Sequence, residues 1–257
     1  MKLYHYTDGA AVKSIIEKEE LWLTDLRFVN DAEELKHGIA LALRYLNTLG
    51  HGLDYDAKSS VEYVIAELKS YLENISPPNN MFSCSFSTVP GLLSQWRSYG
   101  TLAIEFDQAL LERVLPVVEC SYDSDDSYRF AVSNTAEVLN ACLTDFKAQA
   151  GFASGAEQAF KALLTKVAQI KHPSFKEEQE RRVIVSSKGR DIHHRCRGNL
   201  FIPYVAVKVP RESIINIHVG PQANQRLVVQ SVMSMLTACD PDKRIGVGED
   251  STPYRAH

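Results

Sequence analysis

The features that this sequence lacks exclude several classes of protein. The 257 residues include only five cysteines, which are scattered and never spaced Cys-x-x-Cys: Cys84, Cys120, Cys142, Cys196 and Cys239. Such an arrangement does not indicate a disulfide framework, and we expect reduced thiols in a cytoplasmic protein. No apolar run approaches the roughly 18 to 20 residues that a membrane span needs, and the first residues lack the basic-then-apolar layout of a signal peptide. We therefore expect no membrane partner.

The short motifs of common nucleotide-binding sites and of serine hydrolases are missing too. There is no Walker-type loop, no Gly-x-Gly-x-x-Gly loop and no Gly-x-Ser-x-Gly elbow for a catalytic serine. The net charge is -4, from 28 Lys and Arg against 32 Asp and Glu. No global basic field draws the chain to nucleic acid, so such binding would need a local patch.

Hydrophobic periodicity and turn residues predict an α+β fold. Strands are expected at 3–6, 21–23, 81–87, 101–106, 117–122, 183–185, 204–209 and 214–219, and helices at 9–19, 32–49, 61–75, 92–98, most of 132–171 and 224–239. The strands form two groups with most helices between them, which favours α+β over a regularly alternating α/β sheet. We expect one domain over residues 1–257, with a mainly helical insertion at 123–171 and a polar loop at 191–199.

The first candidate residue is His5, in the run Leu3-Tyr4-His5-Tyr6-Thr7. A predicted helix follows at once, with Thr7-Asp8 as its N-cap. A helix N-terminus attracts phosphate, and a histidine beside it can hydrogen-bond a ribose hydroxyl. The alternative is that His5 is a half-buried strand residue bonded to backbone.

The second candidate is the pattern Glu178-x-Glu180-x-Arg182. In a strand these three side chains would share one face. The arginine could keep one glutamate ionised, while the other accepts hydrogen bonds from a sugar or stabilises a developing positive charge. The alternative is a solvated, charged strand edge.

Two further segments carry candidate residues. Ser85 and its neighbours lead into a short helix with Trp96 and Tyr99, which could stack on a flat ring or simply belong to the core. His193-His194-x-Cys196 crowds three potential ligands together without a second pair, so we expect no metal site. The same segment forms the best local basic patch, suited to phosphates of a nucleic acid or a dinucleotide, with Lys188, Arg190, Arg195 and Arg197.

Several blocks, in this order, resemble the bacterial domain of unknown function (DUF) 2971 family. They are Leu3-Tyr4-His5-Tyr6-Thr7, Leu21-Trp22-Leu23-Thr24-Asp25, Phe28-Val29-Asn30-Asp31-Ala32-Glu33, Cys84-Ser85-Phe86-Ser87, Leu93 to Gly100, Phe175 to Arg182, Ile217 to Pro221 and Ser251 to Arg255. The resemblance spans nearly the whole chain and is weakest at 123–171. The family name itself implies no activity.

A strand with His-Tyr-Thr, a helix and a Leu-rich strand is also similar to the start of ADP-ribosyltransferases, with bacterial toxins that modify DNA as the nearest kind. This resemblance implies a split β-sheet core and NAD as substrate. It implies that Glu180, or else Glu178, is catalytic, while Glu177 is a third glutamate in the same block. The residues that it implies as contacts to NAD are His5, Tyr6, Thr7, Asn30, Asp31, Ser85, Trp96, Tyr99 and Arg182.

The expected function is therefore that of an NAD-dependent ADP-ribosyltransferase-like protein, acting as a toxin or phage-defence effector. Its acceptor would be nucleic acid or protein, and an antitoxin could be a further partner. Two alternatives stay open: an NAD glycohydrolase, and a non-catalytic module that binds a nucleotide or nucleic acid. The chain departs from a plain His-Tyr-Glu enzyme because no tyrosine follows the middle strand at the expected spacing.

Overall fold

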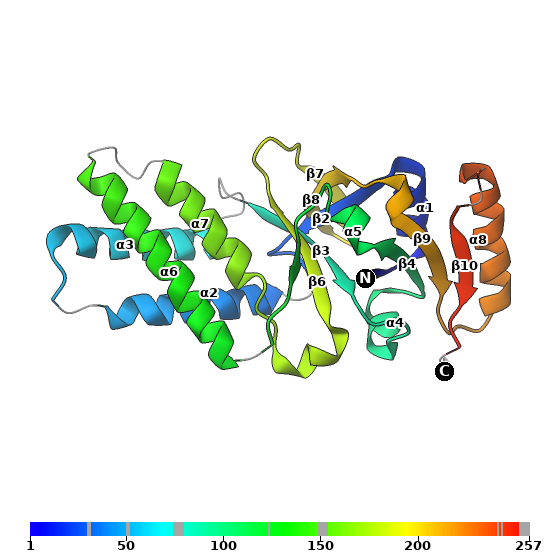
Figure 1. Cartoon of the computed structure of the whole chain (residues 1–257), viewed down its shortest axis with the longest axis horizontal. Helices are drawn as coiled ribbons and strands as arrows, with labels where there is room; N and C mark the ends of the chain where they lie inside the picture. The colour runs from blue at the N-terminus through cyan, green and yellow to red at the C-terminus, as the bar shows by residue number, and fades with distance from the viewer. Residues whose placement is uncertain are drawn as a thin grey trace.

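Helices and strands combine in a mixed α+β fold, as the sequence predicts (Figure 1). The computed structural model describes residues 1–29, 32–49, 52–73, 80–122, 124–148, 154–240, 242 and 244–251. The strands are β1 (Lys2–Thr7), β2 (Glu20–Asp25), β3 (Met81–Ser87), β4 (Leu102–Asp107), β5 (Val117–Glu119), β6 (Glu180–Ser186), β7 (His193–Arg197), β8 (Leu200–Lys208), β9 (Ile214–Val219) and β10 (Gly246–Glu249). The helices are α1 (Gly9–Lys18), α2 (Ala32–Thr48), α3 (Tyr55–Glu73), α4 (Leu93–Tyr99), α5 (Gln108–Leu111), α6 (Ser124–Lys147), α7 (Ser154–Val167) and α8 (Gln225–Cys239), with 3₁₀ turns η1 (Pro173–Glu178) and η2 (Arg211–Ser213).

The sheet splits at β3. Its strand order is β10-β9-β4-β1-β3-β2-β8-β7, with β6 along the other edge of β3 and β5 beyond β6. Strand β1 meets β3 at Ser87, whereas β2 meets it at Phe82 and Ser83. Within the described residues, the middle of β3 therefore pairs with β6 but with neither β1 nor β2. The two halves of the sheet diverge from this point.

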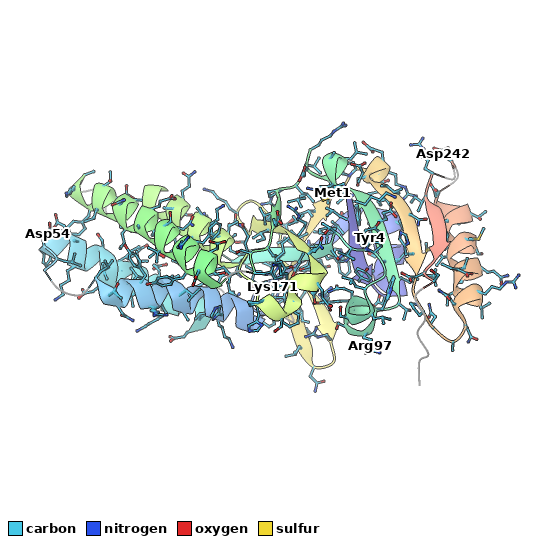
Figure 2. All side chains as sticks on the ribbon, turned by 60° about the horizontal axis from the view of Figure 1, so that its bottom comes forward. Met1, Tyr4, Asp54, Arg97, Lys171 and Asp242 are labelled. Carbon is cyan, nitrogen blue, oxygen red and sulfur yellow. The ribbon has the colours of Figure 1, made fainter. Side chains whose placement is uncertain are left out.

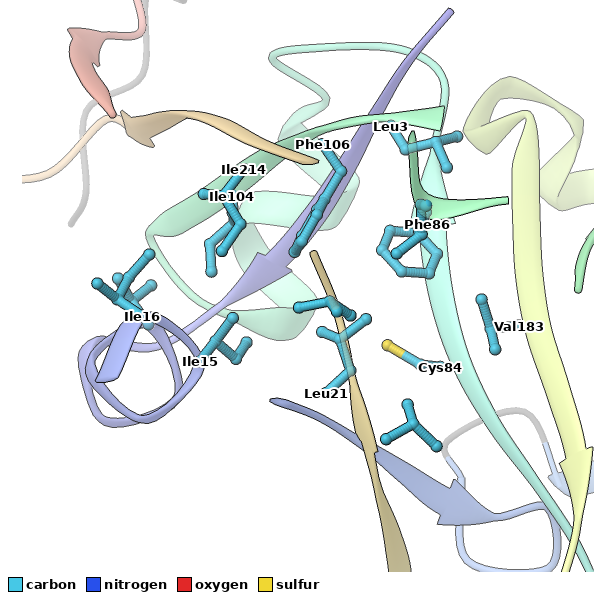
Figure 3. Packing of buried hydrophobic residues seen from close by; sticks show 14 of the residues in the cluster. Leu3, Ile15, Ile16, Leu21, Cys84, Phe86, Ile104, Phe106, Val183 and Ile214 are labelled. Carbon is cyan, nitrogen blue, oxygen red and sulfur yellow. The ribbon is translucent and has the colours of Figure 1, made fainter. Parts of the chain in front are cut away.

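One face of the sheet forms the first hydrophobic core. Side chains alternate along a strand, so Phe82, Cys84 and Phe86 point from β3 to the same side. Figure 3 shows Cys84 and Phe86 in one cluster with Leu3 of β1 and Val183 of β6. Helices α1 and α8 cover this core with apolar side chains spaced at the helical period, and α5 adds Leu111.

A four-helix bundle continues from one end of the sheet (Figure 1). Its members α2, α3, α6 and α7 bury a second core, which also takes Met81 from β3 and Ile184 from β6. Helices α6 and α7 lie within the segment 123–171, which the sequence predicts to be a mainly helical insertion, and they supply only half of this bundle. The other half comes from α2 and α3, which lie much earlier in the chain.

Two errors in the predicted secondary structure bear on the candidate residues. The segment 191–199 is not only a loop, because β7 runs from His193 to Arg197 and pairs with β8 along its whole length. Strand β6 begins at Glu180, so Glu178 does not lie on it. Glu178 ends the turn η1 instead, and Gln179 follows in the left-handed region with φ 41°. The expectation that residues two apart on a strand share one face therefore does not apply to Glu178.

Among the described helices, none combines the length and the apolar character needed to cross a membrane.

Candidate functional site

The ring of His5 lies at the split of the sheet. Its Nδ1 is 3.0 Å from the carbonyl oxygen of Ser85 and 3.6 Å from Sγ of Cys84. Ser85 belongs to the stretch of β3 that β1 and β2 leave unpaired, so the imidazole takes the place of a strand partner. His5 is thus half-buried and bonded to backbone, which is the structural role that the sequence left open.

The environment of His5 fixes which nitrogen carries the proton. Burial lowers the pKa of His5, and the hydrogen bond to Ser85 offsets this only in part. The ring is therefore neutral at neutral pH, with Nδ1–H donating to the carbonyl and Nε2 left as an acceptor. An acceptor nitrogen suits a sugar hydroxyl better than a phosphate.

A cation from a distant strand reaches the same region. Arg195 of β7 is half-buried, and its guanidinium donates to Oγ1 of Thr24 on β2 at 2.9 Å. Burial lowers the pKa of Arg195, and the neighbouring charge of Arg197 lowers it further. Arg195 also interacts electrostatically with His5 and with Asp8 at the start of α1. Thr24 lies on the face of the sheet opposite to His5, so the split brings together an oriented acceptor from one face and a partly desolvated positive charge from the other.

The structure does not bring His5 and Glu180 together. The contacts of His5 place its ring on the side of Cys84, which pairs with Val183 in the first core. Ser87 pairs with Glu180, and side chains alternate along both strands. Glu180 therefore points to the opposite face of the sheet from His5. Arg182 shares the face of Glu180, because it lies two residues further along β6.

Glu178, Glu180 and Arg182 form a buried ion network with Lys171, which the sequence did not single out. Nζ of Lys171 lies 2.8 Å from Oε2 of Glu178 and 2.5 Å from Oε2 of Glu180. Nε of Arg182 lies 2.5 Å from Oε1 of Glu180, and its NH1 donates to the carbonyl of Ala168. Two anions and two cations balance within this network. Figure 2 shows Lys171 between the helical bundle and the sheet.

Both oxygens of Glu180 are therefore engaged by cations of the protein itself. Burial alone would raise its pKa, but the charges and hydrogen bonds of Arg182 and Lys171 lower the pKa of Glu180 to about 2. Glu180 is only 3% exposed. In this structure the network joins the bundle to the sheet, and a sugar could reach the carboxylate only if a cation moved. No short-range pattern marks Lys171, because it lies outside the strand and turn that carry its partners.

Three predicted ring and hydroxyl contacts pack together on the second face. Tyr6 and Trp96 meet edge to face with centroids 4.6 Å apart, and Tyr99 packs against the same cluster. The Tyr6 hydroxyl donates to the carbonyl of Val89. Trp96 is 5% exposed, so the core role that the sequence left open for it is what the contacts show. Together these rings fix α4 on the sheet.

The remaining predicted NAD contacts are likewise divided between the two faces of the sheet. Thr7 is half-buried and lies two residues beyond His5 on the same strand, hence on the same side. The side chain of Ser85 points with Arg182, although its carbonyl receives the His5 proton. Asn30 and Asp31 lie outside the described residues. The predicted set therefore divides between two faces.

A second polar cluster escaped the sequence reasoning. Glu105 of β4 is 2% exposed, and its carboxylate lies 2.6 Å from Nε2 of His218 on β9 and 2.6 Å from Nζ of Lys2. Burial opposes ionisation, but the hydrogen bonds from Lys2 and His218 lower the pKa of Glu105. The cluster depends on strand pairing between segments that lie about a hundred residues apart, which no local motif reports.

Known proteins add nothing to this picture. No protein-family model matches the chain, and no match was found among curated proteins or among solved structures. The resemblances to the DUF 2971 family and to ADP-ribosyltransferases therefore stay predictions, and the function has to be inferred from the geometry of the site.

Proposed function

We propose that this protein binds NAD at the split between β1 and β2. The observation that carries the proposal is the neutral, oriented ring of His5, with Nδ1 bonded to Ser85 and Nε2 available to a ribose hydroxyl. Arg195, anchored to Thr24 and coupled electrostatically to His5, supplies the positive charge that a pyrophosphate needs. The split sheet around a first-strand histidine supports the same ligand.

ADP-ribosyl transfer is the second candidate function, and the same split sheet favours it. In such chemistry the bond between nicotinamide and the ribose anomeric carbon breaks and nicotinamide leaves, while a carboxylate stabilises the positive charge at that carbon. The acceptor then forms the new bond to the anomeric carbon and gives up its proton to solvent. Glu180 and Glu178 remain the proposed carboxylates, but Glu180 points to the opposite face of the sheet from His5 and both glutamates are held by Lys171. They could serve NAD bound at His5 only if this network opened and β6 also rearranged. Hydrolysis of NAD, with water as acceptor, is a separate outcome of the same experiment.

The experiment measures binding and turnover with matched variants. NAD and nicotinamide riboside, which lacks phosphate, are titrated calorimetrically against the wild type, His5→Phe, Arg195→Gln and His194→Ala. His5→Phe keeps a ring in the split but removes both nitrogens, and His194 is an exposed histidine on β7 that serves as the control. Far-UV circular dichroism verifies that each variant is folded.

We expect His5→Phe to lower the affinity for both ligands by at least about tenfold, the usual effect of losing a hydrogen bond between neutral groups in a buried site. Arg195→Gln should lower the affinity for NAD but not for the riboside, while His194→Ala should change neither affinity. Wild-type protein that binds neither ligand would contradict the proposal, as would folded His5→Phe with unchanged affinity. Labelled NAD with cell extract then separates transfer, which labels macromolecules, from hydrolysis, which releases free ADP-ribose.

A further inference from the structure

Three rings form a continuous ladder across β2, β8 and β7. The centroids of Trp22 and Tyr204 are 4.4 Å apart with 24° between the rings, and those of Tyr204 and His193 are 5.5 Å apart with 35° between them. The ammonium of Lys18 lies 5.4 Å from the centre of the Trp22 ring. The ladder therefore starts at a cation and ends at His193.

Strand register produces this ladder. Tyr204 pairs with Thr24 on one side and with His193 on the other, so these side chains share a face. At a spacing of about 4.8 Å per strand, the row spans roughly 10 Å. Trp22 and Tyr204 are half-buried, whereas His193 is exposed and lies on the last strand of the sheet order. A further flat ring can thus stack beyond His193.

Positive charge accompanies the open end of the ladder. Arg195 and Arg197 share the face of His193, at a spacing of about 6.8 Å along the strand. Their mutual repulsion contributes to the lowered pKa of Arg195, and an anion between them would relieve it. The preceding loop adds two basic residues, Lys188 and Arg190, and one acidic residue, Asp191, although the net charge of the chain is -4. The patch is local rather than a property of the whole surface.

We propose that this face, formed by Lys18, Trp22, Tyr204, His193, Arg195 and Arg197, binds single-stranded nucleic acid. Aromatic platforms take unstacked bases of any sequence, and a run of cations follows the phosphate backbone. A duplex keeps its bases stacked and cannot present a ring to His193. An acidic peptide would use the arginines but not the ladder. The inference deepens the proposed function by naming the class of its acceptor. Binding of single strands stands on the geometry of this face, and only their role as acceptor rests on the proposed function.

The test uses fluorescence anisotropy on the full chain. The probes are labelled 12-nucleotide oligo-dT and oligo-rU, a 12-base-pair duplex, and labelled ADP as a mononucleotide, over a series of salt concentrations. The variants are Arg197→Ala and His193→Ala, both at exposed positions, and Arg226→Ala on the exposed side of α8 as the charge-matched control. Melting curves verify that all three are folded.

We expect the single strands to bind more tightly than the duplex and the mononucleotide. His193→Ala should weaken binding by at least about fivefold, as loss of one stacked base does. Arg197→Ala should weaken it and reduce the salt slope by about 0.7, the change for one phosphate contact on a single strand. Arg226→Ala should leave binding unchanged.

Several outcomes would overturn the inference. These are no binding of either oligonucleotide at low salt, equal affinity for the duplex, and equal losses in Arg197→Ala and Arg226→Ala, which would indicate a general polyanion effect. Failure here leaves NAD binding at His5 untouched, because riboside and NAD titrations do not involve His193 or Arg197. Conversely, oligonucleotide binding without NAD binding would support this surface as a nucleic-acid site and contradict the proposed function.

Discussion

At the scale of single residues, the charges around Glu180 balance one another in a buried network. Removing one partner from a buried ion network leaves the others uncompensated, which is far more costly than losing a surface pair. Glu177 lies in the same segment but is exposed. The two glutamates therefore offer a matched comparison of one chemical change in two environments.

Glu180→Gln is expected to lower the free energy of unfolding by about 3 kcal/mol, because Lys171 and Arg182 then share one fewer carboxylate. Glu177→Gln should change it by less than about 0.5 kcal/mol. Urea denaturation followed by circular dichroism measures both. Similar effects from the two substitutions would show that the network contributes little.

Acid unfolding gives a second prediction at this scale. The pKa of Glu180 is about 2 in the folded protein, against 4.5 ordinarily. A lowered pKa contributes stability that is complete above about pH 4.5 and is lost as the pH falls toward 2. This contribution amounts to about 3 kcal/mol. Unfolding free energies of Glu180→Gln should therefore fall less steeply over that pH range than those of the wild type, and parallel curves would contradict the assignment.

At the scale of elements, the end of α4 is set against β1 through a glycine. Gly100 has φ 129°, and a Cβ at this position would lie 2.4 Å from the carbonyl oxygen of Thr7. An alanine there would force α4 away from the strand that carries His5. Gly189 has φ 71° but open space around it, so the same substitution there adds backbone strain only.

Gly100→Ala is therefore expected to lower the melting temperature substantially, with a cost of about 2 kcal/mol or more from clash and strain together. Gly189→Ala should cost about 1 kcal/mol, from the left-handed backbone alone. Differential scanning calorimetry compares the two. Equal shifts would mean that the backbone contact between Gly100 and Thr7 relaxes without cost.

At the scale of the whole molecule, the bundle and the sheet meet through shared core residues and the Lys171 network. Met81 and Ile184 come from the sheet but pack in the core of the bundle. Both tryptophans of the chain, Trp22 and Trp96, lie on or against the sheet, so their fluorescence reports on that part alone. The coupling between the two parts is therefore measurable.

Leu163→Ala removes a fully buried side chain from α7 and should cost about 3 kcal/mol. Because the parts share core residues, we expect tryptophan fluorescence and the helical circular dichroism signal to shift together to lower denaturant. Two separate transitions, with the fluorescence unchanged, would show that the bundle unfolds alone.

The sequence determined much of this protein by itself. Periodicity located most helices and strands, since an amphipathic pattern has only one favourable way to bury its apolar face. The sequence also singled out His5, Glu178 with Glu180, and the basic segment around Arg195. In each case the residue type was informative because the chemistry of its side chain is local.

Only the tertiary structure decided which of these residues meet. The alternation of side chains on β3 and β6 sends His5 and Glu180 to opposite faces, and Lys171 neutralises the glutamates from a distant segment. Pairing of β7 with β8 brings Arg195 beside Thr24 at the split. Register and pairing depend on contacts between residues far apart in the chain, so no local pattern could report them.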